Sequence, residues 1–579
     1  MKKYRLLYIL LLITVVFLSV FYYLHTLSPN KEFTKFTDSL FQSEVASNTL
    51  TLHYTVAHPK NFGIHDYEVT LGSYSSENEQ ETCAAIENYS NSLSQMNRDA
   101  LNAKNKLTYD ILNYYIQNKQ ENLDFYYYPE IFSPAQGLHS QLPIVLAEYE
   151  FRNEKDITDY LTLLSQMDTF FEEAMNYEKY RMDNGVLMAD FSFRTIMDQC
   201  DSFLKNKDSH YLKSTFHTRI QECSFLTAEK IEEYEKQNTV IINQHVFPAY
   251  QKLRASMAEL ESMAPSSMNL CNLPQGAKYY EGLVQQETGS SKTIPEIKKM
   301  LQQEFSIEFL AYADLVDDYS KMEAAAEDNL FGDSPDIMLS DLKDKIFSDF
   351  PEISDADYSI KYVDESLQDF MSPAFYMTPA IDDSLKNVIY INPASNYSSL
   401  NLYTTLAHEG YPGHLYQTLY FNQKNNDPIR NLFYFGGYTE GWAVYVEMYS
   451  YGLAEENRSI CEIQRLNHSI QLCLYSLMDI AIHYDGLQEP DIISNLSRYG
   501  ITDQESARDI YEYISEEPGN YLKYYVGYLE IMELQKYARQ TLGNNFDLKE
   551  FNRFLLDVGP APFDIIKDQE TIWLQKQGA

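Results

Sequence analysis

Residues 387–421 read NVIYINPASNYSSLNLYTTLAHEGYPGHLYQTLYF, and within this stretch the pattern changes from strand to helix. Its first six residues cluster β-branched and aromatic side chains, as do YSIKYV at residues 358–363 and AFYMTP at residues 374–379. Such runs between turn-forming residues are typical of strands, so we expect a small sheet within residues 358–392. From Ser395 onward, Ser and Asn capping residues precede a segment with helical spacing. Strand, turn and helix are therefore expected in that order.

The expected helix carries HEGYPGH at residues 408–414. His408 and His414 offer imidazole nitrogens of the kind that bind zinc, and Glu409 stands beside the first of them. A glutamate that stays unligated can accept a proton from water polarised by the ion. We therefore predict a catalytic site for one Zn2+ ion, with His408 and His414 as metal ligands and Glu409 as the general base.

The spacing of these histidines imposes a condition on the helix. In the common H-E-x-x-H pattern the two histidines lie about 40° apart on one face, at about 100° per residue. His408 and His414 are six positions apart, and a straight helix would separate them by about 240°. Pro412 disfavours a continuous helix, while Gly410 and Gly413 permit distortion. The two imidazoles can meet only if the helix bulges or breaks.

A third ligand is expected from the segment EGWAVYVE, which begins at Glu440, 26 residues after His414. Glu440 would complete a set of two histidines and one carboxylate, with water in the fourth position. Glu447 lies seven residues further on the same helical face. It is expected either to accept a hydrogen bond from a ligand imidazole or to be the ligand itself. The alternative is that both are ordinary helix carboxylates.

Asp479 and His483 are four residues apart on a later helix, so their side chains can meet. A histidine oriented by an aspartate near a metal would suit oxyanion stabilisation or proton transfer in peptide hydrolysis. The alternative is a buried polar contact without a catalytic role. His139, His245 and His468 show no ligand spacing and are assigned to the core or the surface.

The overall composition is that of an acidic globular protein. The 579 residues include 45 Lys and Arg against 84 Asp and Glu, which gives a formal net charge of −39, and 44% of the residues are hydrophobic. A surface this acidic repels phosphate backbones, so nucleic acid is excluded as a partner. The six cysteines contain no CxxC pair, and a thiolate metal site is not expected. One or two disulfides remain open if the chain is exported.

The N-terminal segment carries a targeting signal. Lys2, Lys3 and Arg5 precede an uncharged run over residues 6–24, long enough as a helix to cross a hydrocarbon core of about 30 Å. No cysteine follows the run as a site for lipid attachment, and no cleavage site of small residues, such as A-x-A, is evident. We expect a retained signal anchor over residues 1–27, a polar stalk over residues 28–45, and the rest outside the cytoplasm. The alternative, a cleaved signal peptide, leads to the same compartment.

Most of the remaining chain has helical spacing with few Gly or Pro, for example over residues 156–177, 228–262 and 297–325. No linker divides it. We therefore expect a mainly α fold in which residues 46–579 form a single α-rich domain. A small β-sheet precedes the active-site helix, and the site lies within residues 358–530.

These segments together resemble a bacterial family catalogued as domain of unknown function 885, predicted to be zinc metallopeptidases of the gluzincin kind. The resemblance rests on HEGYPGH, EGWAVYVE and the D-x-x-x-H of Asp479 and His483. It extends to a late motif matched by Pro518, Gly519, Asn520, Tyr524 and Gly527. It covers most of the chain after the first 45 residues, densely after Tyr358 and thinly before it.

The resemblance implies a gluzincin-like fold with His408, His414 and Glu440 as metal ligands and Glu409 as the base. It adds Asp479, His483 and Tyr524 to the catalytic residues. The chain departs from the family where arginines usually precede the D-x-x-x-H motif, where a Lys usually follows the late Tyr (here Tyr525), and where a His is usual near the C-terminus (here Asn552). If those cations hold a substrate carboxylate, this protein should prefer a different substrate group or bind its substrate more weakly.

The expected function is that of a single-pass, membrane-anchored zinc metallopeptidase that acts on peptide substrates outside the cell. An edge of the small sheet could hold an extended peptide by strand addition. One alternative is an inactive relative that uses the cleft as a peptide- or wall-binding module, and another is a metal-dependent amidase for non-protein amides. The sequence identifies neither the substrate, nor the cleavage mode, nor the oligomeric state.

Overall fold

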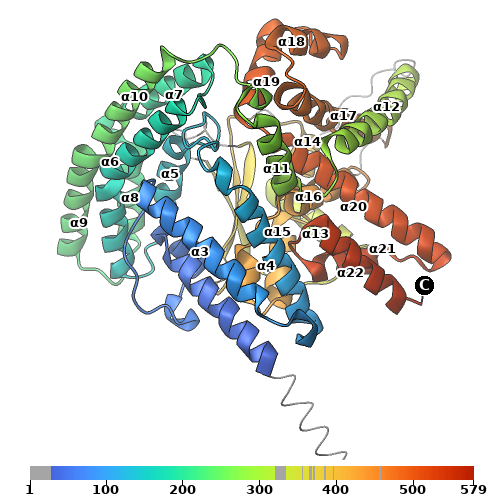
Figure 1. Cartoon of the computed structure of the whole chain (residues 1–579), viewed down its shortest axis with the longest axis horizontal. Helices are drawn as coiled ribbons and strands as arrows, with labels where there is room; N and C mark the ends of the chain where they lie inside the picture. Colours follow the sequence, from blue (N-terminus) through green and yellow to red (C-terminus); the bar gives the residue numbers. More distant parts are fainter. Residues whose placement is uncertain are drawn as a thin grey trace, which may run out of the picture.

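The fold is seen in a computed structural model that describes residues 28–319, 334–354, 356–363, 368, 372–383, 386–395, 397–454 and 458–578. Helices account for most of these residues and surround a small sheet (Figure 1), which confirms the mainly α fold. The predicted anchor over residues 1–27 lies outside this part of the chain. Over the described ranges, no helix combines the length and the apolar character needed to cross a membrane.

The first described residues, 28–46, form a helix that packs into the protein. Phe33, Leu40, Phe41 and Val45 are buried in its large hydrophobic core. The prediction of a polar stalk over residues 28–45 is therefore wrong. The buried residues recur at helical spacing, and the many polar residues between them occupy the solvent side of the helix.

The N-terminal half contains two groups of helices. The first comprises α2 (Thr49–Thr55), α3 (Ser76–Ser94) and α4 (Ala103–Glu121). The second encloses a hydrophobic cluster of its own and lies together at the left of Figure 1. Its members are α5 (Leu138–Ala147), α6 (Glu154–Asp183), α7 (Asp190–Phe203), α8 (Tyr211–Gln221), α9 (Ala228–Ile241) and α10 (Phe247–Glu261).

The C-terminal half supplies most of the larger core, in which Tyr403, Trp442 and Tyr525 are fully buried. Three helices precede the sheet: α11 (Gly276–Thr288), α12 (Ile294–Tyr319) and α13 (Pro335–Lys345). Those that follow it are α14 (Ser399–Glu409), α15 (His414–Lys424), α16 (Gly436–Ser450), α17 (Arg458–His483), α18 (Glu489–Arg498), α19 (Gln504–Glu516), α20 (Asn520–Leu542), α21 (Leu548–Val558) and α22 (Phe563–Lys576).

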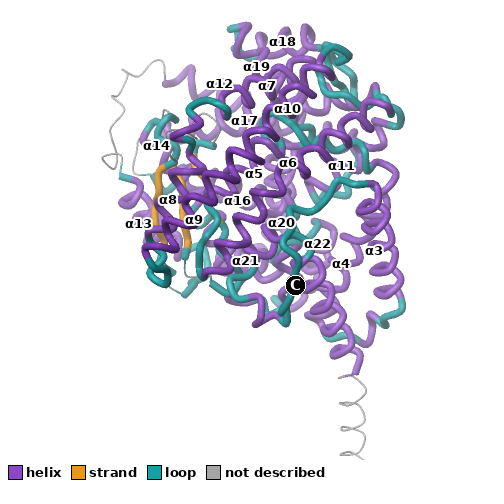
Figure 2. The backbone as a smooth tube through the Cα atoms, turned by 90° about the vertical axis from the view of Figure 1, so that its left-hand side faces the viewer, coloured by secondary structure: helices purple, strands orange, loops and turns teal. Residues whose placement is uncertain are grey.

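The described sheet has three strands, β1 (Tyr358–Tyr362), β2 (Ala374–Met377) and β3 (Asn387–Ile391). Their order is β1-β3-β2, with β1 parallel and β2 antiparallel to β3. Helix α14 follows β3 after a short turn, and Figure 2 shows the strands beside α14. This order matches the predicted succession of strand, turn and helix. It leaves β2 as an edge strand next to the predicted site.

Helices α16 and α20 cross with their backbones in close approach. A Cβ atom on Gly441 would lie 2.4 Å from the carbonyl carbon of Gly527, and a Cβ atom on Gly527 would lie 2.1 Å from the carbonyl oxygen of Gly437. Only glycine fits at these positions, because any side chain would collide with the facing backbone. The crossing places Glu440 on α16 near Tyr524 on α20.

Candidate metal centre

The predicted helix break is present between the two histidines. Helix α14 ends at Glu409 and α15 begins at His414, so His408 and His414 occupy neighbouring ends of two helices. A Cβ atom on Gly413 would lie 1.7 Å from the carbonyl oxygen of His408, which makes glycine necessary where the chain returns. The indole of Trp442 donates a hydrogen bond to the Pro412 carbonyl at 3.0 Å. Helix α16 therefore stabilises the break between α14 and α15.

The break brings the two imidazoles together. Their ring centroids are 4.9 Å apart. Ligand atoms of His408, Glu409 and His414 all lie within 4.8 Å of one another, the arrangement of a possible metal site among the described residues. The Glu440 Oε2 atom lies 3.3 Å from His414 Nε2 and 3.7 Å from His408 Nε2.

Two carboxylates therefore compete for the third ligand position. Ligands about 2.0–2.1 Å from a tetrahedral zinc ion lie about 3.3–3.4 Å from one another. Glu440 meets this condition closely with His414 and approximately with His408. Glu409 is held by a different bond, in which its Oε2 accepts from the backbone N–H of Tyr376 at 2.8 Å. We therefore favour Glu440 as the ligand and Glu409 as the base.

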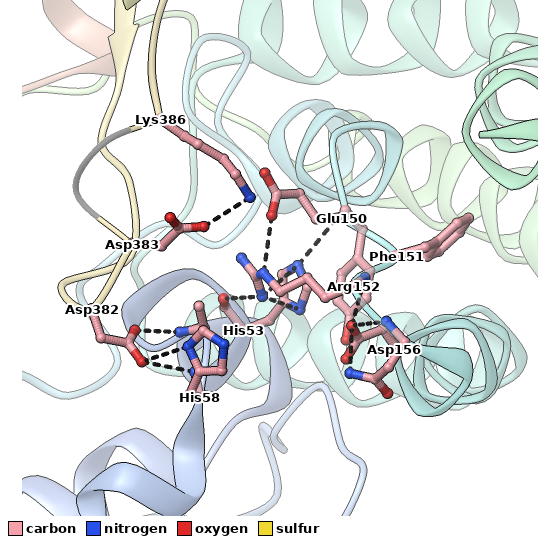
Figure 3. Close-up of polar contacts among 12 residues, drawn as sticks. His53, His58, Glu150, Phe151, Arg152, Asp156, Asp382, Asp383 and Lys386 are labelled. Atoms are coloured by element: carbon pink, nitrogen blue, oxygen red, sulfur yellow. Dashed lines mark hydrogen bonds and ion pairs between the residues drawn. The ribbon is translucent and has the colours of Figure 1, made fainter. Parts of the chain in front are cut away.

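Strand β2 binds Glu409 through the Tyr376 N–H. The turn that follows β2 is itself held by the segment after α2 (Figure 3). Asp382, in the turn after β2, accepts hydrogen bonds from the backbone N–H groups of Ala57 and His58 at 2.6 and 2.9 Å. The backbone N–H of Ile381 donates to the Thr55 carbonyl at 3.0 Å. The C-terminal end of α2 thus positions the strand that orients the candidate base.

Glu447 lies behind His408, as one of its two predicted roles requires. Its Oε2 atom is 3.0 Å from His408 Nδ1 and its Oε1 atom is 3.3 Å from His468 Nε2. A hydrogen bond donated from Nδ1 leaves the Nε2 lone pair of His408 facing Glu440 and His414. The sequence predicts only a core or surface position for His468. It contacts the site through Glu447, and no spacing in the sequence signals this.

Tyr434 is a second residue that the sequence did not indicate. Its hydroxyl donates to Glu440 Oε1 at 3.1 Å, which leaves Oε2 facing the imidazoles. Tyr434 precedes α16 on the loop after α15, where no motif marks it. The side chains of His408, His414 and Glu440 are 14%, 16% and 14% exposed, so a small ligand can reach a site that is otherwise enclosed.

The electrostatics of the cluster favour a bound cation. Burial would lower the pKa of His408, but hydrogen bonds to Glu440 and Glu447 outweigh burial and raise this pKa well above its ordinary value. Burial would raise the pKa of Glu440, but His414 and His408 hold it well below its usual range. The pKa of Glu409 is raised, chiefly by burial. Three carboxylates around two imidazoles leave a negative excess that positive charge would balance.

Tyr524 lies over this cluster, as its place in the late motif implied. Its ring centroid is 6.4 Å from that of His408. Burial, followed by the charge of Glu440, raises the pKa of its hydroxyl well above 10. The side chain therefore stays protonated at neutral pH and can donate a hydrogen bond.

The predicted contact between Asp479 and His483 is absent. Asp479 is fully buried and accepts hydrogen bonds from Tyr280 at 2.5 Å and from the Gly519 backbone at 2.7 Å. His483 donates from Nε2 to the Ile514 carbonyl at 3.0 Å and accepts from the Leu270 N–H at 3.5 Å.

Neither residue of this pair forms a hydrogen bond or ion pair with the metal cluster within the described ranges. The prediction that Asp479 orients His483 for catalysis is wrong, because four-residue spacing permits contact without requiring it. Asp479 instead fixes Gly519 at the start of α20, the helix that carries Tyr524.

Comparisons with known proteins agree with the motifs. The family described as "Bacterial protein of unknown function (DUF885)" matches residues 59–569. No protein with a curated description matches significantly.

Two solved structures are also similar to this chain. One, described as "the putative lipoprotein from Colwellia psychrerythraea", has a TM-score of 0.86 at 21% identity and covers 95% of this chain and 100% of its own. Another, "a putative lipoprotein of unknown function from Shewanella oneidensis", has a TM-score of 0.65 at 16% identity, with 93% and 99% covered. At these identities the likeness extends to the fold alone. Because the family match spans most of the sequence, this chain belongs to the DUF885 family of bacterial proteins.

Proposed function

We propose that this protein is a zinc-dependent peptidase of the gluzincin kind, held at the membrane and facing outward. One observation carries the proposal: His408, His414 and Glu440 converge across the break between α14 and α15, with Glu409 at their side. Two imidazoles and one carboxylate, with a nearby unligated glutamate, form the donor set of zinc hydrolases.

The residues present fit a zinc ion. His408 and His414 offer their Nε2 atoms and Glu440 offers Oε2, while Glu447 and Tyr434 hold two of these ligands from behind. A bound zinc ion would polarise the scissile carbonyl and lower the pKa of water.

Glu409 would serve as the general base. Its Oε2 is occupied by the Tyr376 N–H, which fixes the carboxylate and leaves Oε1 to take a proton from the attacking water. Its raised pKa would help it to pass that proton to the leaving amine. Tyr524, which faces the cluster as a protonated hydroxyl, would donate a hydrogen bond to the oxyanion.

The edge of the sheet would bind the peptide backbone. The N–H of Tyr376 points away from β3 toward Glu409. Because the N–H and C=O of one strand residue point to the same side, its carbonyl also faces the outer edge of β2. An extended substrate could pair there by strand addition, which would bring its scissile bond close to Glu409.

The proposed location rests on two separate features. The similar proteins from Colwellia and Shewanella are described as putative lipoproteins, a class attached to membranes. This chain has no cysteine before Cys83 and carries an apolar run over residues 6–24 instead. We propose that this run attaches the protein, with the metal cluster outside the cytoplasm.

The test combines metal analysis with substrate digestion, both on the full-length protein in detergent. We expect about one zinc ion per chain, together with cleavage of a mixed peptide library that a chelator abolishes and added zinc restores. Zinc without cleavage of peptides, but with hydrolysis of non-protein amides, would identify an amidase. Absence of both metal and hydrolysis would favour a binding module.

A further inference from the structure

A cavity lies near the metal cluster. It has a volume of about 280 Å3 and lies between α11, the start of α20 and the segment that precedes α5. Pockets for small molecules usually hold about 300–1,000 Å3. The size of this cavity therefore suits one side chain or one terminal group of a larger ligand.

Acidic side chains outnumber basic ones in the lining of this cavity. Four carboxylates, those of Glu130, Glu287, Glu516 and Glu517, line it together with a single ammonium group, that of Lys523. Arg181 reaches Glu130 from outside the lining at 3.5 Å, but Arg181 also pairs with Glu178 at 2.6 Å.

These carboxylates are poorly compensated. Burial is the main reason that the pKa of Glu130 and that of Glu516 are each raised to about 8. Glu287 makes no hydrogen bond or ion pair with the described residues. Burial raises its pKa as well, and the charge of Lys523 opposes this only in part. Buried carboxylates are stable as anions when a cation pairs with them, and the protein supplies too few cations here.

An independent observation concerns the wall of the cavity. Tyr279 is only 8% exposed, and its hydroxyl forms no hydrogen bond with the described part of the chain. Tyr279 lines the cavity, and its hydroxyl lies within electrostatic range of Glu130 and Glu287. The hydroxyl can therefore bond a ligand or water in the cavity. The Tyr128 ring, 4.6 Å away between centroids, adds a second aromatic surface, and such surfaces attract cations.

The cavity adjoins the metal cluster through the start of α16. A Cβ atom on Gly436 would lie 2.7 Å from the carbonyl oxygen of Glu287 and 3.2 Å from the Lys523 side chain. Glu440 lies one helical turn after Gly436, and Tyr524 follows Lys523 directly. A chain bound at Glu440 could therefore extend into the cavity.

We propose that this cavity is a specificity pocket that takes a cationic group of the substrate, an ammonium or guanidinium, during hydrolysis at the metal cluster. The substrate class rests on the proposed function, whereas the recognition of a cation does not. The ammonium group has three N–H donors, which match the free carboxylate of Glu287, a second carboxylate and the Tyr279 hydroxyl.

The experiment measures binding in the full-length Glu409→Gln protein, in which turnover is blocked. Three probes are titrated by calorimetry: Ac-Ala-Lys-Ala-NH2, its neutral norleucine counterpart Ac-Ala-Nle-Ala-NH2, and Ala-Nle-Ala-NH2, whose only cation is the α-ammonium. We expect a cationic probe to bind roughly 10- to 100-fold more tightly than the neutral one, the range for charge-assisted hydrogen bonds. The cationic probe that binds more tightly shows whether the pocket takes a lysine side chain or an N-terminal ammonium group.

Two variants then test whether the preference for a cationic probe arises in this pocket. Glu287→Gln and Tyr279→Phe each remove a group that has no hydrogen bond or ion pair with the described residues, so both should fold. Each should reduce the preference for the cationic probe by about 10-fold, without changing affinity for the neutral one. The matched control, Glu505→Gln, changes the same charge at an exposed position of α19 and should have no effect.

The two proposals fail in different ways. Equal affinity for cationic and neutral probes, or no binding of any probe, would overturn the pocket even if wild-type protein cleaves peptides. A cationic preference that survives both pocket variants would also overturn it. A preference that both variants abolish would support the pocket even if metal analysis and digestion exclude a peptidase.

Discussion

The indole N–H of Trp442 donates a hydrogen bond to the carbonyl oxygen of Pro412 at 3.0 Å, and both residues are buried. This bond connects the third-ligand helix to the break that separates the other two ligands. Glu440 lies two residues before Trp442, and His414 lies two residues after Pro412. The bond therefore ties all three ligands into one unit.

Replacing Trp442 by Phe should loosen this unit. The change leaves the Pro412 carbonyl without its donor, which costs about 1–3 kcal/mol of unfolding free energy. Metal affinity should fall as well, because the ligands lose their shared support. Denaturant unfolding and metal titration check the two effects. Unchanged affinity would mean that the ligand geometry does not depend on this bond.

Replacing Gly413 by Ala should abolish metal binding. The added Cβ would lie 1.7 Å from the His408 carbonyl oxygen and 2.4 Å from that of Ala407, so the chain between α14 and α15 must move. Elemental analysis of the purified variant is the measurement. As a control, Gly282→Ala on α11 meets only the flexible side chain of Asn122, at 3.0 Å, and should retain the ion.

Replacing Glu409 by Gln should separate catalysis from metal binding. A general base contributes to rate and not to metal affinity, so turnover should fall by about 10²–10⁴-fold while the zinc content stays the same. The amide oxygen of Gln can still accept from the Tyr376 N–H. Loss of the ion in this variant would instead assign Glu409 as a ligand and reopen the role of Glu440.

Removal of the N-terminus should have two outcomes that depend on where it stops. Deletion of residues 1–27 removes the apolar run and leaves the helix over residues 28–46, so a folded protein without membrane attachment is expected. Deletion of residues 1–46 also removes Phe33, Leu40, Phe41 and Val45 from the core. Each buried side chain contributes about 1.5–3 kcal/mol. Thermal unfolding should show a markedly less stable product for the longer deletion, and equal melting temperatures would restore the stalk interpretation.

Asp479 should make stability depend on pH. Burial raises its pKa from 3.8 to about 7, so the folded state binds this proton more tightly than the unfolded state does. Stability is therefore fully present below about pH 4 and is lost progressively as pH rises toward 7, by up to about 4 kcal/mol.

The variant Asp479→Asn cannot ionise and should remove this contribution. Its melting temperature, compared with that of the wild type from pH 5 to pH 8, should show a difference that grows with pH. Burial lowers the pKa of His483 to about 4, so this residue destabilises the fold as pH falls below 6.5. That opposite effect is present in both proteins and cancels in the comparison. A difference that is constant with pH would place the Asp479 pKa near its ordinary value.

The amino-acid sequence determined the local features of this protein. Strand, turn and helix between β3 and α14 follow from propensity and capping. Pro412, with Gly410 and Gly413, disfavours a continuous helix between the two histidines. The candidate ligands His408, His414 and Glu440 and the candidate base Glu409 could be named from residue chemistry, because zinc accepts only a few donor types.

Tertiary structure decided which distant residues meet. Glu447 connects His408 to His468, Tyr434 holds Glu440, and Asp479 bonds to Gly519 instead of His483. Local periodicity fixes only which face of its own helix a side chain occupies. The partner on the facing element depends on how helices cross, and here α16 and α20 cross closely because glycines meet at Gly441 and Gly527. That contact joins residues 86 positions apart in the chain, a relationship that no local pattern encodes.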